Sequence, residues 1–487
     1  MDARHYGSPR LHCRPLRAQR NPLIRVALGL ELRNLLRSPL RLLVLLLVLG
    51  AGSFVIAQGQ QDVKRWQEAI AAGQAAQEES LAEARGYFAE GKKGPADRSW
   101  VDLTQPHWQD YYAATRFARL PAPLAGIAFA SAESGAVTVR LNRFADPLLA
   151  EGNRIENPAL AVTGGLDLVA VLALLLPLLI MALGVEIGGY ERAAGVLPLV
   201  RMQSGHDRSW IWARCVAVGV IAASAGLLLT AMATLLAGAS PVSALPLALL
   251  VLAYVVFWTA LLGAVAVLAR NPSQGAVALG AAWILLCVLI PSLGSERSAA
   301  LAADDFALDL TVQARDAGAA TAQLKEDELY EALFARFPAL AKQAPEPRSS
   351  GVRAAAGGMG IISLEKRMRS REKRGEAHRK LVTTMSLASP TLSFSHALEG
   401  LAGRGPDAAR AFRFAVADAV AGRVERTIAG TWSGAPLDVE DFEALVAASP
   451  TSFETPSTAW GASLATLVAW TLALLGGATF WARRLDQ

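Results

Sequence analysis

Long apolar runs alternate with long polar segments along this chain. The apolar runs are each about twenty residues long and lie at 40–57, 166–185, 212–237, 244–268, 273–293 and 459–482. A helix of about twenty apolar residues is long enough to cross a hydrocarbon core of roughly 30 Å. The pattern therefore predicts an all-α polytopic membrane protein with six transmembrane helices.

The first apolar run has one alternative interpretation, a cleaved signal peptide. A signal peptide has a short basic leader and a cleavage site with small residues. Here residues 1–39 precede the run, and no small-x-small site follows Phe54. We therefore expect the run to stay in the membrane.

Composition agrees with a membrane protein. Hydrophobic residues make up 53% of the chain and charged residues 18%, whereas a soluble domain carries about 25% charged residues. The three cysteines are Cys13, Cys215 and Cys287, and none of them lies in a long polar segment. These segments therefore have no disulfide framework.

Arginine placement predicts the orientation of the spans. Arginines gather in residues 1–41, in the turn after the second span, and at 483–484 after the last span. Short loops rich in Lys and Arg face the cytoplasm, so both termini are expected there. The polar segments 58–165 and 294–458 then lie outside. The basic run 363–380 does not contradict this, because long loops translocate largely regardless of charge.

The expected organisation follows directly from the spans. It comprises a cytoplasmic tail with an amphipathic entry helix (1–39), the first span (40–57), an extracytoplasmic segment (58–165), the second span (166–185), a cytoplasmic turn (186–211), spans three to five (212–237, 244–268 and 273–293), a second extracytoplasmic segment (294–458), the last span (459–482) and a short cytoplasmic tail (483–487). In the second span, Pro177 predicts a kink.

Both extracytoplasmic segments are expected to be mainly helical and to pack together. In the first, Val63, Trp66 and Ile70 have helical spacing, so residues 58–90 should extend the first span outward, although Gly73 and Gln77 interrupt the apolar stripe. Residues 136–144 alternate between apolar and polar and predict a strand.

In the second segment, residues 301–340 and 407–428 have helical patterns, and 343–360 is rich in Pro, Gly and Ser and predicts a loop. Residues 386–403 are weakly amphipathic, which favours a place against the membrane surface.

The turn after the second span reads EIGGYERAAGVLPLVRMQSGHDRSWIWAR, residues 186–214. Its pattern predicts a helix over 191–202, bent at Pro198. The chain contains no G-x-x-x-x-G-K-[ST] motif, and GKKG at 91–94 lacks that spacing. Any ATP-driven activity would therefore need a separate ATPase.

This turn resembles the turn of the ABC-2-type permeases, the membrane subunits of one class of ATP-driven exporters. Family members have an acidic residue, a glycine and leucines after the second span, then a small residue and basic residues before the third. The matching positions here are Glu191, Gly195, Leu197, Leu199, Ser204, Arg208 and Arg214. Val196 departs from the threonine that is frequent in relatives.

The layout of large outer segments after spans one and five, and the phrase LASPTLSFSHALEGLAGRG, look like the branch of permeases described as copper-enzyme-maturation components. The resemblance implies a non-catalytic exporter subunit in the bacterial inner membrane. It would form a dimer with an identical or related permease and would work with ABC ATPase subunits, which bind ATP and Mg. A periplasmic partner is a further candidate.

The resemblance also implies that residues 191–202 form a coupling helix docked on the ATPase. The residues assigned to this contact are Glu191, Gly195, Leu197, Leu199, Arg201 and Arg208. The alternative is an ordinary solvated turn that touches lipid headgroups.

Two basic groups are candidates for contact with anions. Arg25, Arg33 and Arg37 lie on the entry helix, where they would hold it on anionic membrane lipid. In the basic run, the candidates are Lys366, Arg367, Arg369 and Arg371. The alternative for the second group is a solvated helix face balanced by neighbouring glutamates.

Other chemistry finds little support in the sequence. Met359, Met368, His378, Met385 and His396 are too scattered for a copper site. We identify no catalytic residue, no metal site, no directly bound cofactor and no nucleic-acid partner. The alternative function is a membrane-anchored sensor or assembly scaffold whose outer segments bind a partner protein. An intramembrane enzyme is disfavoured, because the spans lack ionisable residues away from their ends.

Overall fold

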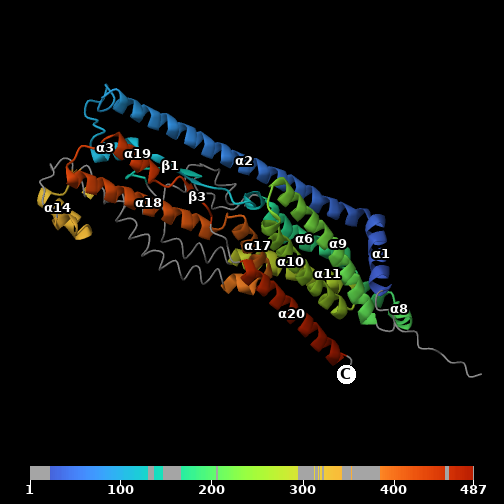
Figure 1. The fold of residues 1–487 in the computed structure, drawn as a ribbon. Helices are drawn as coiled ribbons and strands as arrows, with labels where there is room; N and C mark the ends of the chain where they lie inside the picture. Colours follow the sequence, from blue (N-terminus) through green and yellow to red (C-terminus); the bar gives the residue numbers. More distant parts are fainter. Residues whose placement is uncertain are drawn as a thin grey trace, which may run out of the picture.

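The computed structural model describes residues 22–129, 137–145, 166–204, 207–293, 323–342, 384–455 and 460–485, with a few isolated positions between 312 and 353. Its fold is that of an all-α polytopic membrane protein, with six helices in the described part that are long and apolar enough to cross a membrane. Figure 1 shows these helices gathered in a bundle, from which a second group of elements extends in one direction.

Each of the six helices overlaps one predicted apolar run. The second and fifth helices each contain a π-helical part, named η3 and η4. The span elements are α2 (Pro39–Ala89), α5 (Leu168–Ala170) with η3 (Val171–Leu175) and α6 (Leu176–Gly184), α9 (Asp207–Leu236), α10 (Pro241–Leu268), α11 (Pro272–Trp283) with η4 (Ile284–Leu289), and α20 (Trp460–Leu485).

Just before Pro177, where a kink was predicted, the second span contains the π-helical turn η3. Proline has no N–H, so the carbonyl of Ala173, four residues earlier, loses its usual helical donor. The Tyr254 hydroxyl of α10 donates to that carbonyl at 2.7 Å. The freed carbonyl is thus satisfied by a neighbouring helix, as the absence of water in a bilayer requires.

Helix α2 continues far beyond its apolar run, as its sequence predicts. It has 51 residues, which at about 1.5 Å per residue gives a rod of roughly 75 Å. Trp66, Ile70 and Leu81 are buried. The two interruptions of the stripe mark contacts with a small sheet: Gly73 lies against strand side chains, and the Gln77 side chain accepts a hydrogen bond from the Arg116 amide.

The elements beyond the bundle come from both polar segments and are called the distal module here. Besides α2 from Gln58 onward, it contains α3 (Pro106–Tyr112), β1 (Thr115–Arg119), β2 (Thr138–Leu141), α14 (Glu326–Arg336), η5 (Leu340–Lys342), α18 (Pro406–Ser433), α19 (Val439–Ala447) and β3 (Ser452–Phe453). As predicted, the two segments pack together, and a bidentate pair joins Arg85 of α2 to Glu443 of α19 at 2.6 and 3.0 Å.

The three strands form one sheet in the order β2-β1-β3. Strand β2 fulfils the prediction for residues 136–144 and pairs antiparallel with β1. The sequence did not predict β1 or β3. Because β3 comes from the second segment and runs parallel to β1, the sheet itself joins the two segments.

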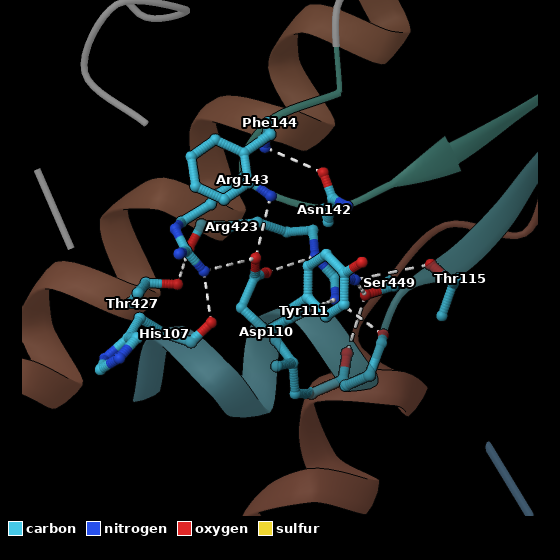
Figure 2. A network of polar contacts seen from close by, with 12 residues as sticks. His107, Asp110, Tyr111, Thr115, Asn142, Arg143, Phe144, Arg423, Thr427 and Ser449 are labelled. Carbon is cyan, nitrogen blue, oxygen red and sulfur yellow. Dashed lines mark hydrogen bonds and ion pairs between the residues drawn. The ribbon is translucent and has the colours of Figure 1, made fainter. Parts of the chain in front are cut away.

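A buried ion pair joins the same segments at the centre of the distal module (Figure 2). Arg423 of α18 is fully buried. Its Nε donates to Asp110 Oδ1 at 2.8 Å and its Nη1 to Ser449 Oγ at 2.6 Å, while its Nη2 donates to the Ala113 carbonyl at 2.7 Å. The Arg143 amide donates to the other Asp110 oxygen at 2.9 Å. Buried charges are tolerated when hydrogen-bonded in this way.

Helix α17 (Pro390–Leu401) corrects the prediction that residues 386–403 lie against the membrane surface. It packs among the span helices, where Phe394 stacks on Tyr254 of α10 with ring centroids 4.2 Å apart. Ser389 donates to the Leu286 carbonyl in η4 at 3.3 Å, and Trp470 of α20 donates to the Leu387 carbonyl at 2.9 Å. These hydroxyl and carbonyl contacts are available only inside the bundle.

The remaining predictions for the second segment have mixed outcomes. The helix predicted over 407–428 is α18, which runs on to Ser433. Of the helix predicted over 301–340, the structure describes mainly α14 and η5. The loop 343–360 lies almost wholly outside the described residues, and the basic run 363–380, with Lys366, Arg367, Arg369 and Arg371, lies entirely outside them.

Candidate functional site

The turn between the second and third spans contains two short helices rather than the single bent helix predicted over 191–202. These are α7 (Gly189–Ala193) and α8 (Leu197–Ser204). Gly195 separates them with φ of 68°, a left-handed conformation that glycine adopts without steric cost. Pro198 lies in the first turn of α8, where a missing N–H costs nothing. The helix is therefore interrupted at Gly195, and Pro198 lies inside α8.

Two glycines press the turn against the connection between α10 and α11. A Cβ atom on Gly188 would lie 2.1 Å from the Ala266 carbonyl oxygen, and one on Gly189 would lie 2.7 Å from the backbone of Asn271. No larger side chain fits either position without moving backbone. The sequence analysis did not single out these residues, although a Gly-Gly pair at the end of a span is a visible signal of close approach.

Arg192 adds a second attachment at the same place. Its guanidinium donates to the carbonyls of Ala266 at 2.8 Å, Val267 at 2.8 Å and Ala269 at 2.5 Å. These carbonyls at the end of α10 have no helical partners, and a basic side chain is a favourable cap for them. The turn is thus fixed to spans four and five.

A buried charge cluster attaches the turn to two further elements. Arg214 of α9 donates from Nε to Glu31 of the entry helix α1 (Pro22–Arg37) at 2.5 Å. It also pairs with Glu191 of α7. The second Glu191 oxygen accepts from the Gly188 amide at 2.7 Å. Glu31 and Glu191 are only 3% and 6% exposed, so this Glu31–Arg214–Glu191 cluster is an internal clamp.

The clamp changes the role that the sequence suggested for Glu191. Its carboxylate is enclosed by α1, α7 and α9 and is not available on the surface, so it positions the turn. Glu31 is a residue that the sequence analysis missed. The sequence did offer an indication, because Glu31 is an isolated acidic residue among the arginines of the entry helix.

The turn exposes several apolar side chains to solvent, and these form what we call the α7–α8 surface. Tyr190 is 60%, Leu199 52% and Met202 78% exposed, and Val196 is also exposed. Leu197 is half-buried and Gly195 is exposed. Arg208 is half-buried in the first turn of α9, and the side chain of Arg201 lies outside the described part. Exposed apolar groups gathered on one turn are typical of a contact surface.

The entry helix α1 has one buried face and one exposed face. Ala27, Glu31 and Leu35 are buried, and Ala27 packs against Ala213 and Ala217 of α9. The exposed face carries the arginines predicted to contact the membrane surface together with apolar side chains: Arg25, Arg33, Arg37, Ile24, Val26, Leu32 and Leu36. That combination suits the boundary between lipid and water.

The described residues contain no group of three or more His, Cys, Asp or Glu side chains placed to hold a metal ion. Comparison with family models, with curated proteins and with solved structures finds no match for this chain. The likeness of residues 186–214 to the ABC-2-type permeases therefore stays a prediction, and the geometry of the turn is the main support for a function.

Proposed function

We propose that this chain is the membrane-spanning permease subunit of an ATP-driven ABC-2-type transporter, working as an exporter with separate ATPase subunits. The α7–α8 surface is the docking site for the ATPase. The observation that carries this proposal is that the turn has an exposed apolar surface and is also attached by buried contacts to α1, α9 and α10. An ordinary solvated turn needs neither feature.

The buried contacts that attach the turn allow it to transmit force to the membrane-spanning helices. Displacement of α7 and α8 is transmitted to α9 through Glu191 and Arg214, and to α10 through Arg192. Separating a buried ion pair leaves an uncompensated charge, which costs about 3–5 kcal/mol. The turn and these spans therefore move together and not independently.

Helix α2 extends the same connection to the distal module. At its beginning, Arg41 pairs with Glu186 of the turn at 2.5 Å. Further along, within the apolar run of α2, Gly52 lies directly against Leu229 of α9. Because α2 is one continuous helix, a shift at its bundle end reaches the distal module, where it would act on a substrate or a partner.

The proposed orientation has the turn and both termini in the cytoplasm, the distal module on the other side, and the chain in a bacterial inner membrane. The helices α1 and α8 lie at the end of the bundle away from the distal module (Figure 1). The arginine-rich sequences therefore share one end, which supports the orientation. A second permease subunit, identical or related, would complete the transporter.

Affinity purification of the full chain from its own membranes tests the docking. We expect an ATPase carrying G-x-x-x-x-G-K-[ST] to be retained, and the double variant Leu199→Asp/Met202→Asp to retain at least about tenfold less, a loss of about 1.4 kcal/mol. Trp100→Asp is the matched control, because Trp100 is 66% exposed but lies in the distal module. Equal retention by both variants would refute the docking surface.

The alternative is a membrane-anchored sensor or scaffold, and the construction of the distal module supports it. Buried contacts such as Asp110 with Arg423 build one folded unit from two distant segments, as a partner-binding domain requires. Absence of any ATPase from the purified material, with a protein bound through the distal module instead, would support this function.

A further inference from the structure

We propose that a groove between α1, α2, α6 and α7 binds the headgroup of a zwitterionic phospholipid that carries a primary amine, such as phosphatidylethanolamine. The groove has a volume of about 700 Å³, within the range of roughly 300–1,000 Å³ typical of small-molecule sites. Nothing in this proposal depends on an ATPase; it requires only that the six helices span a membrane.

The groove has a polar end and an apolar wall. Arg37 and Arg41 from the joint between α1 and α2, with Glu186 and Tyr190 from the turn, line its polar end. Leu40, Val44 and Val185, at the beginning of α2 and the end of the second span, line the apolar wall. A lining that changes from charged to apolar over one helical turn or two fits the boundary between a headgroup and its acyl chains.

The polar end presents both a cation and an anion to a ligand, and this distinguishes between classes of lipid. Arg214 is neutralised by Glu31 and Glu191. Arg41 is paired with Glu186 at 2.5 Å, but the Arg41 side chain is only 13% exposed whereas that of Glu186 is 58% exposed. A ligand therefore meets an accessible carboxylate beside the exposed Arg37, which has no ion pair among the described residues.

A phosphoethanolamine headgroup matches both charges. Its phosphate is the natural partner of a guanidinium, and its ammonium can donate hydrogen bonds to the carboxylate of Glu186. The exposed ring of Tyr190 offers a favourable face to the same cation. A phosphatidylglycerol headgroup has no cation for Glu186, and the quaternary ammonium of phosphatidylcholine has no N–H to donate.

The acyl chains have a continuous apolar path away from the groove. Leu40, Leu43 and Leu47 are all more than half exposed on α2. They follow one another at helical spacing from the groove toward the middle of the bilayer. A phospholipid seated here therefore contacts the entry helix, the first span and the turn at once.

Native mass spectrometry of the full chain extracted from nanodiscs tests the site. With equal amounts of phosphatidylethanolamine, phosphatidylcholine and phosphatidylglycerol, we expect retained phosphatidylethanolamine to exceed its bulk share several-fold. Arg37→Ala should abolish this enrichment. Glu186→Gln should shift retention from phosphatidylethanolamine to phosphatidylglycerol, because the repulsive carboxylate is gone. Arg25→Ala is the matched control, since Arg25 is exposed on α1 outside the groove.

Several results would overturn the proposal. These are lipid retention in proportion to the bulk, preferential retention of phosphatidylglycerol by the unmodified chain, or equal effects of Arg37→Ala and Arg25→Ala. Soluble phosphoethanolamine, titrated into the detergent-solubilised protein, separates a lipid from a free phosphate ester. Binding of that compound as tight as that of the lipid would contradict a site built for phospholipid. Unchanged melting temperatures of the variants establish that they fold.

Discussion

Two arginines, one fully buried and one half-buried, join parts of this chain that are far apart in sequence. Arg214 brings Glu31 and Glu191 together at the bundle end, and Arg423 holds Asp110 inside the distal module. In both places the guanidinium bridges elements that no local pattern connects. Each arginine is therefore a residue whose loss should separate elements and not merely remove a charge.

Arg423→Met should destabilise the distal module by about 3 kcal/mol, because the buried Asp110 then keeps only the more distant guanidinium of Arg143. The double variant Asp110→Leu/Arg423→Met should recover only part of that loss, since Arg143, which also pairs with Asp110, stays buried and charged. Melting temperature and protease resistance of the purified protein measure both effects. Arg426→Met is the control, because Arg426 is exposed on the same helix and should change stability by less than about 0.5 kcal/mol.

His107 gives the distal module a dependence on pH. Burial, with the nearby Arg143 charge, lowers the pKa of His107 from 6.5 to about 4. The folded state thus resists a proton that the unfolded chain accepts, so stability should fall as the pH drops from about 6.5 to 4. His107→Asn should lose stability less steeply over that window. Identical slopes for the two proteins would contradict this assignment.

Residue chemistry explains why the candidate site was predicted only in part. The acidic, glycine and leucine positions of the turn marked its location, and Leu199 is indeed on its surface. The burial of Glu191 was not predictable, because its partner Arg214 and the third member, Glu31, lie on other helices. Sequence spacing identifies neighbours on one helix but not charges that meet across several.

At the scale of elements, α2 packs so closely at one position that only glycine fits there. Its backbone at Gly59 lies against the η1 turn (Ala125–Ala128), so closely that an added Cβ would fall 1.9 Å from the Gly126 oxygen. By contrast, nothing lies within 4 Å of a Cβ at Gly50 in the same helix. The same substitution by alanine therefore meets close-packed backbone at Gly59 and open space at Gly50.

Gly59→Ala should destabilise the protein by about 1–3 kcal/mol, because backbone must shift to admit the methyl group. Gly50→Ala should be neutral or slightly stabilising, since alanine favours a helix more than glycine does. Thermal unfolding of the two purified variants compares them. A lower melting temperature for Gly50→Ala than for Gly59→Ala would show that this contact does not exist.

The elements that the sequence predicted are those determined by local pattern. The six long apolar helices and the outward extension of α2 follow from hydrophobic runs and helical spacing. Strands β1 and β3 do not, because they are short and their pairing with each other joins two segments that are far apart in the sequence. The prediction for helix α17 was wrong because its contacts come from other helices. For example, the hydroxyl of Ser389, at the N-terminus of α17, donates to the Leu286 carbonyl in the π-helical part of another span.

At the scale of the whole molecule, the proposed function needs two ends with different tasks. The clamp and the α7–α8 surface lie at one end of the bundle, and the distal module lies at the other (Figure 1). Helix α2 runs through both. If the bilayer surrounds the bundle, the long rod carries motion from one side of the membrane to the other, as the proposed exporter subunit requires.

The most direct test is the sidedness of single cysteines in intact cells. Trp100 in the distal module and Met202 on the α7–α8 surface are 66% and 78% exposed, so each should react when replaced by cysteine in a Cys13→Ser background; Cys215 and Cys287 are buried. With a membrane-impermeant maleimide that reaches the periplasm, Trp100→Cys should be labelled in intact cells and Met202→Cys only after lysis. Labelling of Met202→Cys in intact cells would contradict the cytoplasmic docking turn.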